Sequence, residues 1–531
     1  MSKRLSMGDA FSPIAARFAA LAKTHAGVTA LRNGLPGAAG VTYDFAKFWR
    51  RIERVTGHLQ SAWAVQAGDR LAWLGLNHEL QLVTLVACAR LGVIFMPLNY
   101  RLAAAELRHV LEDAQPKLLV HDAAHTALAE QLGLGLGLGL GLGLGPGAGD
   151  MRLVVQERLI DTASPRHLLV PEIQADAPAL LVYTSGTTGK PKGAVHTQAG
   201  LLANAQASDF AHGFKGADHV LSTLPLFHVG GLCIQTLPAL LCGVTVTLHL
   251  RFDPAKWLQA VAQDKPTLSL LVPATLRAVM DHTEWQGTDL TSLRGVMTGS
   301  STIPLPYLQA FHDRGIPVGQ IYGTTETGPV SIVLPLDQAT ARIGTTGWPH
   351  PLAQVQLRNE NNEAVPAGHI GQVCIRAPNV MRGYWQGLKG VLSTDEGLSA
   401  GWFATGDLGR QDVDGCITIV GRSKDMIISG GENIYPAEIE NLLLTLDGVA
   451  ECTVVGLDDV RWGEVPVAVL VRSHTAAGQV LSEEAVINHL HISIARFKLP
   501  RRVVFMDSLP KSALGKVQKP VLKARLQADK V

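Results

Sequence analysis

Strand-like and helical segments alternate in the first part of the chain, and this alternation restricts the fold more than any other feature. Strand-like runs at 69–75, 93–97 and 117–121 are separated by segments of helical periodicity at 79–91 and 103–114. A helix between successive strands is typical of parallel pairing, because the chain must cross over the sheet between them. The sequence therefore predicts an α/β fold with doubly wound sheets.

The pattern changes twice towards the C-terminus. Strand-like runs punctuated by turns dominate from about 355 to 419, which predicts a β-rich section. A polar joint, Gly-Arg-Ser-Lys-Asp at 421–425, then precedes a second alternation of strands and helices. Because 531 residues exceed one typical core, we expect a large N-terminal domain at 1–421, a hinge at 422–425 and a small α+β domain at 426–531.

Composition excludes several classes of protein. Hydrophobic residues make up 47% of the chain and charged residues 17%, which indicates a well-buried globular protein. A net charge of +1 indicates neither a nucleic-acid partner nor an anionic membrane surface. The six cysteines have no Cys-x-x-Cys spacing and are expected to be reduced core residues. With no long apolar segment at the N-terminus, we expect a cytoplasmic protein. The sequence leaves the oligomeric state open, a homodimer included.

Two segments invite other interpretations. Residues 219–250 carry no Asp, Glu, Lys or Arg and are long enough to cross a bilayer. Their prolines, glycines and histidines, and the alternation at 244–250, favour a buried helix-plus-strand unit without integral membrane association. Residues 132–147 are dominated by a strict Leu-Gly alternation ending in Pro-Gly. Glycine at every second position makes a strand costly, so we expect a low-complexity loop without chemistry.

A loop rich in glycine, hydroxyl and lysine side chains follows an apolar run. Its sequence is Tyr183-Thr-Ser-Gly-Thr-Thr-Gly-Lys-Pro-Lys-Gly193. Glycines let backbone N–H groups approach phosphate oxygens, hydroxyls donate without adding charge, and lysines neutralise negative charge. It is not a Walker loop, since only two residues separate Gly186 from Gly189 and Pro191 follows Lys190. Composition alone allows a polyphosphate cradle or a surface loop without function.

Further stretches place chemistry-bearing residues in a definite order. They are Leu224-Pro-Leu-Phe-His-Val-Gly-Gly231, Gln320-Ile-Tyr-Gly-Thr-Thr-Glu-Thr-Gly328, Trp402-Phe-Ala-Thr-Gly-Asp407, Gly421-Arg-Ser-Lys-Asp425, Ile428-Ser-Gly-Gly-Glu-Asn-Ile-Tyr435 and Pro510-Lys-Ser-Ala-Leu-Gly-Lys516. Together with the loop they resemble the motifs of the adenylate-forming (AMP-binding) superfamily, in its acyl-CoA synthetase branch. The resemblance covers residues 183 to 519 and implies an enzyme that uses ATP, Mg²⁺ and coenzyme A.

The resemblance implies a role for each nucleotide contact. Glu326 would hold Mg²⁺, a hard cation that prefers oxygen ligands. Asp407 would grip the ribose hydroxyls, with Arg422 as a second contact. The remaining nucleotide-binding residues would be Thr184, Ser185, Gly186, Thr187, Thr188, Gly189, Lys190 and Lys192 for phosphates, and Gly299, Ser300, Ser301, Tyr322, Gly323, Thr324 and Thr325 around the base and α-phosphate. Of these, Tyr322 would stack on adenine, while Thr298-Gly-Ser-Ser301 departs from the usual Gly-Gly-Ala form.

Four further positions concern the reaction itself. By resemblance, Lys516 reaches into the site during adenylation and Lys424 is the hinge about which the C-terminal domain turns. Gly430 and Gly431 would let the pantetheine arm pass close to the backbone. His228 would lie beside the acyl pocket on the path of the thiol. Amino-acid-activating relatives have Asp there, so His228 disfavours an amino-acid substrate.

The implied reaction joins a carboxylic acid to CoA through an acyl-adenylate. Residues 227–242 are apolar and contain no Arg or Lys for a second carboxylate, so an apolar monocarboxylic acid is expected, fatty or aromatic. Two alternatives remain: an adenylation enzyme that loads a carrier protein, and a non-catalytic nucleotide-binding module. The presence of Glu326, Asp407 and Lys516 together argues against the second.

Overall fold

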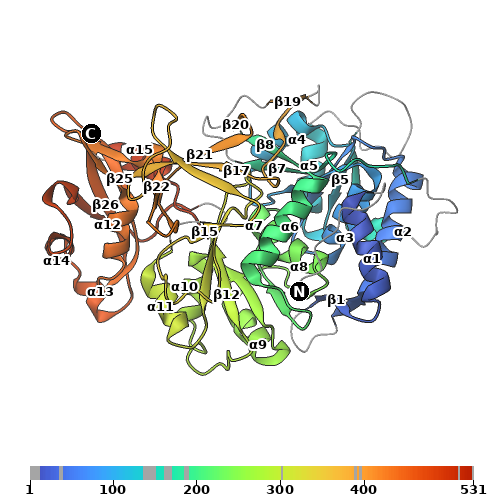
Figure 1. The fold of residues 1–531 in the computed structure, drawn as a ribbon, viewed down its shortest axis with the longest axis horizontal. Helices are drawn as coiled ribbons and strands as arrows, with labels where there is room; N and C mark the ends of the chain where they lie inside the picture. The colour runs from blue at the N-terminus through green and yellow to red at the C-terminus, as the bar shows by residue number, and fades with distance from the viewer. Residues whose placement is uncertain are drawn as a thin grey trace.

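The computed structural model describes residues 12–34, 40–135, 151–160, 170–184, 191–300, 303–387, 391–393, 398–511 and 515–528. Figure 1 shows a large N-terminal part in blue to yellow and a smaller C-terminal lobe in orange and red. Strands alternate with helices through most of the N-terminal part. The predicted α/β class with a small C-terminal domain is confirmed.

The first sheet has eight strands and carries the glycine-rich loop. Its order is β19-β18-β8-β7-β4-β3-β5-β6, and the strands from β7 to β6 are parallel while β8, β18 and β19 are antiparallel. The strand bounds are β3 Arg70–Leu74, β4 Ile94–Leu98, β5 Leu118–His121, β6 Arg152–Val155, β7 Pro178–Thr184, β8 Lys192–Thr197, β18 Gly383–Gln386 and β19 Val391–Ser393.

The second sheet has nine strands, and those at its centre all run parallel. Its order is β15-β14-β13-β12-β11-β9-β10-β1-β2. The bounds are β1 Thr29–Asn33, β2 Val41–Asp44, β9 His219–Ser222, β10 Thr245–Leu248, β11 Leu268–Leu271, β12 Gly295–Gly299, β13 Val318–Tyr322, β14 Ile332–Leu334 and β15 Trp348–Pro349. The carboxyl ends of β9, β11, β12 and β13 therefore meet at one edge, where ligands bind in open α/β sheets.

Helices pack against both sheets. One buried core cluster holds side chains from both sheets together with α1, α2, α3, α6 and α8. Helix α3 is buried on nearly every side, which suits its apolar sequence. The helices of this part are α1 Pro13–Thr24, α2 Phe45–Trp63, α3 Glu79–Leu91, α4 Ala104–Ala114, α5 Thr126–Gly135, α6 Gln198–His212, α7 Val229–Gly231, the π-helix η3 Leu232–Thr236, α8 Leu237–Leu241, α9 Pro254–Asp264, α10 Pro273–Met280 and α11 Leu305–His312, with short 3₁₀ turns η1 Ala123–His125 and η2 Gln156–Ile160.

An antiparallel sheet joins the two parts of the molecule. It orders β16-β17-β21-β20, with β22 also paired to β21, and it corresponds to the β-rich section predicted from the sequence. The bounds are β16 Gln354–Arg358, β17 Ile370–Arg376, β20 Leu398–Ser399, β21 Trp402–Gln411 and β22 Ile417–Arg422. After β22 the chain turns through η5, Ser423–Asp425, into the C-terminal domain.

The C-terminal domain is a mixed sheet covered on both faces. Neighbouring residues point to opposite faces, as Val454 packs with α12 and α14 whereas Val455 packs with α15. The sheet order is β24-β23-β26-β25, with β27 parallel to β26. The bounds are β23 Ile427–Ser429, β24 Glu432–Ile434, β25 Val449–Asp459, β26 Gly463–Arg472, β27 Arg502–Phe505, α12 Pro436–Leu443, α13 Ala476–Val480, α14 Glu483–His491, η6 Arg496–Lys498 and α15 Lys519–Ala528.

Two sequence interpretations can now be compared with the fold. Residues 219–250 form β9, α7, η3, α8 and β10, the buried unit that was expected. Among the described residues, no helix combines the length and the apolarity needed to cross a bilayer.

The prediction that residues 132–147 form a loop is wrong at its start. Residues 132–135 continue helix α5, and Leu132 is fully buried beside Ala129. Burial of leucine offsets the helix cost of glycine, which is about 1 kcal/mol per residue. Residues 136–147 lie outside the described part of the chain.

Candidate active site

The glycine-rich loop is the tip of a hairpin. Strands β7 and β8 pair antiparallel in a register that brings Thr184 opposite Lys192. The hydroxyl of Tyr183, at the base of the loop, donates to Asp113 of helix α4 at 2.5 Å. The loop is thus anchored to the first sheet and its covering helix. The predicted phosphate ligands Ser185, Gly186, Thr187, Thr188, Gly189 and Lys190 lie outside the described residues.

Tyr384 connects this loop to the predicted metal ligand, and the sequence reasoning missed it. Its strand, β18, pairs with β8 and aligns Tyr384 with Ala194. The Lys192 ammonium lies 5.5 Å from the centre of the Tyr384 ring, and the Tyr384 hydroxyl donates to Glu326 Oε1 at 2.9 Å. The only signal in the sequence is an aromatic pair after a glycine, Gly383-Tyr-Trp385.

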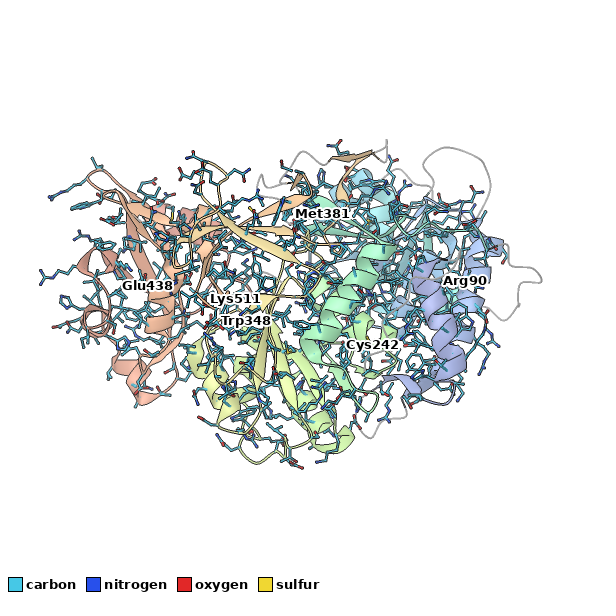
Figure 2. The ribbon with its side chains drawn as sticks, viewed as in Figure 1. Arg90, Cys242, Trp348, Met381, Glu438 and Lys511 are labelled. Carbon is cyan, nitrogen blue, oxygen red and sulfur yellow. The ribbon has the colours of Figure 1, made fainter. Side chains whose placement is uncertain are left out.

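Glu326 follows strand β13 in a tightly packed turn. The backbone N–H of Met381, labelled in Figure 2, donates to the carbonyl oxygen of Glu326 at 2.7 Å. In the part of the chain that is described, no group of three or more acidic, His or Cys residues could cage a metal ion. A lone carboxylate fits Mg²⁺, which is usually held by one or two carboxylates plus substrate phosphates.

Tyr322 and Asp407 meet although they lie on different sheets. The Tyr322 hydroxyl donates to Asp407 Oδ2 at 2.8 Å and also contacts the Thr405 hydroxyl at 3.2 Å. Asp407 pairs through its other oxygen with Arg422 Nε at 3.0 Å, because β21 and β22 align these two residues. Burial, and then the neighbouring Asp407 carboxylate, raise the pKa of Tyr322 far above its usual value, so its hydroxyl stays protonated. This cluster combines an aromatic ring with a carboxylate suited to ribose hydroxyls.

Strand β12, whose end is predicted to bind adenine, pairs with strand β13, which carries Tyr322. Gly299 of β12 aligns with Ile321 of β13, and a Cβ at Gly299 would lie only 2.3 Å from the Ile321 carbonyl oxygen. Only glycine fits there. Ser300 adopts a left-handed φ of 77°, an unusual backbone for serine. Ser301 lies outside the described residues.

The residues after Tyr322 form a compact turn. A Cβ at Gly323 would meet the Pro329 carbonyl oxygen at 2.1 Å, and the Thr324 N–H donates to the Thr327 hydroxyl at 2.9 Å. His196 of β8 forms a hydrogen bond with the backbone of Thr325, and burial lowers the pKa of His196 to about 4. The turn that carries Thr325 and Glu326 is therefore held from the first sheet.

Lys516 reaches this cluster from the C-terminal domain. Gly515 approaches Ala274 at the start of α10, since a Cβ on Gly515 would lie 2.8 Å from the Ala274 side chain. Lys516 is exposed to solvent, and the protein packed around it partly desolvates its ammonium group. That desolvation, followed by the positive charge of Arg422, lowers the pKa of Lys516 to about 8, while Asp407 acts in the opposite direction.

His228 is also close enough to Lys516 to be affected by its charge. Its Nδ1 accepts a hydrogen bond from the Gly230 N–H at 2.9 Å and caps helix α7. Burial, followed by the charge of Lys516, lowers the pKa of His228 to about 4, so the ring is neutral at pH 7. A Cβ at Gly230 would lie 4.0 Å from the Ser300 hydroxyl, which places the start of α7 beside the end of strand β12, where adenine binding is predicted.

The predicted hinge residue lies close enough to the cluster for its charge to act on Lys516, whereas the predicted pantetheine glycines have their contacts within the C-terminal domain. Lys424 is in the turn η5 that leaves the antiparallel sheet. The Gly430 N–H donates to the Trp462 carbonyl oxygen at 2.8 Å, within the C-terminal domain. Gly430 and Gly431 both have positive φ, at 60° and 88°. The structure therefore brings together Tyr322, Asp407, Arg422, Lys516 and His228, and places the two glycines elsewhere.

Family comparisons agree with this arrangement. Residues 18–385 match the family model for AMP-binding enzymes, and residues 438–516 match the model for the C-terminal domain of AMP-binding enzymes. The two matches together include Glu326, His228 and Lys516.

Similar proteins cover nearly the whole chain. The indoleacetate–CoA ligase of Aromatoleum aromaticum is 41% identical over 91% of this chain and 94% of its own. A feruloyl-CoA synthase of an Amycolatopsis species is 38% identical over 94% and 96%. The structure of o-succinylbenzoate coenzyme A synthetase from Bacillus subtilis with ATP and a magnesium ion matches with a TM-score of 0.82, 30% identity and coverage of 96% and 99%. The chain therefore belongs to the AMP-binding enzyme family and is an AMP-forming acid–CoA ligase that uses ATP, Mg²⁺ and CoA.

Proposed function

We propose that the chain activates an aromatic monocarboxylic acid and that the structure corresponds to the state that forms the acyl-adenylate. The observation that carries this proposal is the position of Lys516. It comes from the C-terminal domain, yet its electrostatic partners include Asp407, Arg422 and His228 of the N-terminal part. A cation at this point is suited to the negative charge that develops when a carboxylate approaches ATP.

In the first half-reaction, a carboxylate oxygen of the acid attacks the α-phosphorus of ATP. The bond from the α-phosphorus to the bridging oxygen breaks, and pyrophosphate leaves with its electron pair. Lys516 neutralises charge on the reacting groups, and the loop at 184–192 binds the departing phosphates. Mg²⁺ held by Glu326 would neutralise charge on the polyphosphate. Asp407 and Arg422 orient the ribose, and Tyr322 packs against the base.

In the second half-reaction, the CoA thiol attacks the acyl carbonyl, loses its proton and expels AMP. Lys516 has to leave for the thiol to enter. We propose a rotation of residues 426–531 about Lys424 that replaces Lys516 by Gly430 and Gly431. His228 is neutral at pH 7, so it adds no positive charge along the path by which the CoA thiol enters.

An aromatic acid is favoured over a fatty acid by the two curated relatives described above, at 41% and 38% identity. Both curated relatives described above act, by their names, on acids with rings. The segment from Val229 to Leu241 is buried and apolar apart from Gln235 and Thr236. Such a segment suits an acid that carries an uncharged ring at the end distant from its carboxylate. We place the enzyme in the cytosol, with free CoA as acceptor in preference to a carrier protein.

A panel of acids tests this proposal. Pyrophosphate and AMP release should be measured with indole-3-acetic, 4-hydroxycinnamic, benzoic and decanoic acids, each with and without CoA. We expect kcat/KM for at least one ring-bearing acid to exceed that for decanoic acid by about tenfold or more, the discrimination that pocket shape alone can supply. A preference for decanoic acid would contradict the aromatic assignment. Acyl transfer to a carrier protein but not to CoA would contradict the proposal that free CoA is the acyl acceptor.

The pKa of Lys516 predicts how adenylation depends on pH. Lys516 is charged below its pKa of about 8 and neutral above it. Because the charged form stabilises the transition state, kcat/KM for ATP in the adenylation half-reaction should fall as the pH rises through about 8. This parameter reports the free enzyme, and it can be followed by ATP–pyrophosphate exchange. In Lys516→Arg the group stays charged, so this decline should disappear from the range of pH 7 to 10. A decline that persists in Lys516→Arg would assign it to another group.

A further inference from the structure

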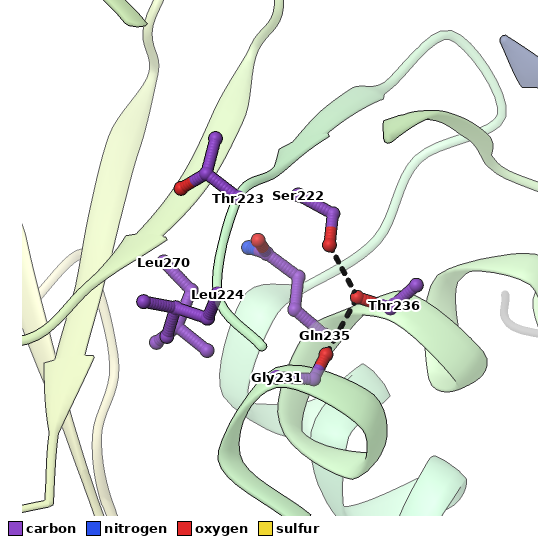
Figure 3. A pocket seen from close by; sticks show the side chains of 7 residues that line it. All are labelled: Ser222, Thr223, Leu224, Gly231, Gln235, Thr236 and Leu270. Atoms are coloured by element: carbon purple, nitrogen blue, oxygen red, sulfur yellow. Dashed lines mark hydrogen bonds between the residues drawn. The ribbon is translucent and has the colours of Figure 1, made fainter. Parts of the chain in front are cut away.

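A small buried cavity lies beside the end of helix α7 and the π-helix η3 that follows it. It is lined by Ser222, Thr223, Leu224, Gly231, Gln235, Thr236 and Leu270 (Figure 3). These residues come from the end of β9, from strand β11 and from the π-helix η3 with the glycine before it. A π-helix is rare and frequently occurs at functional sites. The cavity is narrower than a water molecule in this conformation, so it has to widen before anything enters.

The four polar side chains in this lining fall into two groups. The Ser222 and Thr236 hydroxyls bond to each other at 2.7 Å, and Thr236 also donates to the Gly231 carbonyl oxygen at 2.6 Å (Figure 3). By contrast, both polar atoms of the Gln235 amide and the Thr223 hydroxyl have no hydrogen-bond partner among the described residues. Gln235 and Thr223 are each only 1% exposed.

Such an arrangement is costly in an apolar core. A buried amide without partners loses its hydrogen bonds to water on folding and gains none in return, and native proteins contain few such groups. An apolar side chain of similar shape would avoid this cost, so a polar group at this place is explained best by a partner that arrives with a ligand.

The cavity lies along the same helical segment as His228, the residue predicted to lie beside the acyl pocket. Gly231 and Gln235 follow His228 by about one and two helical turns. Leu224, Leu270 and Ile234 belong to one apolar cluster with Met297 and Ile321, the strand residues that lead to Gly299 and Tyr322. A carboxylate held near His228 and Lys516 would therefore direct the far end of the acid along this cluster towards Gln235.

We propose that Gln235, assisted by Thr223, is a specificity-determining residue that binds a neutral N–H or O–H group at the distal end of the acid. The amide oxygen of Gln235 accepts this hydrogen bond, and its NH₂ group or the Thr223 hydroxyl can donate to an oxygen of the same ligand. No Asp, Glu, Lys, Arg or His is found among the described residues of the cavity lining, which argues against a charged distal group. The inference rests on the proposed function and narrows its substrate class to ring acids with a hydrogen-bond donor.

Matched pairs of acids test this inference. Indole-3-acetic acid is compared with 1-benzothiophene-3-acetic acid, and 4-hydroxycinnamic acid with cinnamic acid, so that the pairs distinguish a ring N–H from a phenol. In the wild-type enzyme, kcat/KM for one donor-bearing acid should exceed that for its partner by about ten- to a hundredfold, the range for a buried hydrogen bond. In Gln235→Met, which keeps the side-chain size, that ratio should approach one because the apolar acid is no longer penalised.

Thr236→Val is the matched control. It alters the same cavity, but the Thr236 hydroxyl is already engaged by Ser222 and Gly231, so the ratio between paired acids should stay as in the wild type. Thermal unfolding of each variant shows that it is folded. A merely structural Gln235 would change both members of a pair equally, and an unchanged ratio in Gln235→Met would overturn the inference.

The two proposals fail in different ways. If the wild-type enzyme uses ring acids but does not distinguish the paired acids, the inference is overturned while the proposed function stands. If only decanoic acid releases pyrophosphate, the aromatic assignment fails and the inference fails with it.

Discussion

Replacing Lys516 with alanine should slow formation of the acyl-adenylate about a thousandfold, the effect typical of removing one group that stabilises transition-state charge. Lys516 is exposed, and the charges of Asp407 and Arg422 act on it while its own charge acts on His228. Conversion of supplied acyl-adenylate and CoA to the thioester should change less than about threefold, because Lys516 has to leave before the thiol attacks. The two half-reactions are measured separately, as ATP–pyrophosphate exchange and as CoA-dependent release of AMP.

Lys511→Ala provides the control for that experiment. Lys511 precedes the same segment and pairs with Glu451 at 2.6 Å within the C-terminal domain. An exposed pair of this kind contributes at most about 1 kcal/mol to stability, so both half-reactions should keep their wild-type rates. Equal losses in both half-reactions of Lys516→Ala would contradict the assignment of Lys516 to adenylation alone.

Replacing Asp407 with alanine should raise the KM for ATP about a hundredfold. The carboxylate is the point at which Tyr322 and Arg422 meet, at 2.8 Å and 3.0 Å. Its loss removes the proposed ribose acceptor, and a charge-assisted hydrogen bond in a buried site contributes about 1.5–3 kcal/mol. Isothermal titration with a non-hydrolysable ATP analogue would measure the loss of affinity directly.

A purely structural contribution of Asp407 can be separated from nucleotide binding by Tyr322→Phe. This variant removes the hydroxyl that donates to Asp407 but leaves the carboxylate and its pair with Arg422 in place. We expect a loss of unfolding free energy of about 1 kcal/mol, with a KM for ATP within about fivefold of the wild type. If Tyr322→Phe weakened nucleotide binding as much as Asp407→Ala, the carboxylate would have no special role towards the ribose.

Local sequence patterns predicted the regular elements well. The helix expected at 79–91 is α3, and the strand expected at 69–75 is β3. These segments are bounded by clear changes in hydrophobic period, and their burial on sheets or between helices agrees with that period. The exception is α5, which runs into the Leu-Gly repeat because tertiary burial of Leu132 outweighs the low helix propensity of glycine.

The partners within the site were less predictable. Tyr384 lies in no motif that the sequence reasoning identified, and it enters the site only because β18 pairs with β8. In the sequence, Gln235 is one polar residue within an apolar run. Only the structure shows that its amide is buried and has no hydrogen-bond partner among the described residues. Pairing and burial depend on residues that are distant in sequence.

The sequence by itself determined the class of reaction, because its short motifs resemble those of the AMP-binding enzymes and carry Glu326, Asp407 and Lys516, residue types suited to Mg²⁺, ribose and phosphate. Only the tertiary structure decided which groups meet. Strand pairing sets Asp407 against Arg422, the crossing of two sheets brings Tyr322 to the same carboxylate, and the docking of the C-terminal domain delivers Lys516. The physical reason is that a side chain's type follows from the sequence, whereas its hydration, its charge environment and its hydrogen-bond partners depend on neighbours that folding supplies.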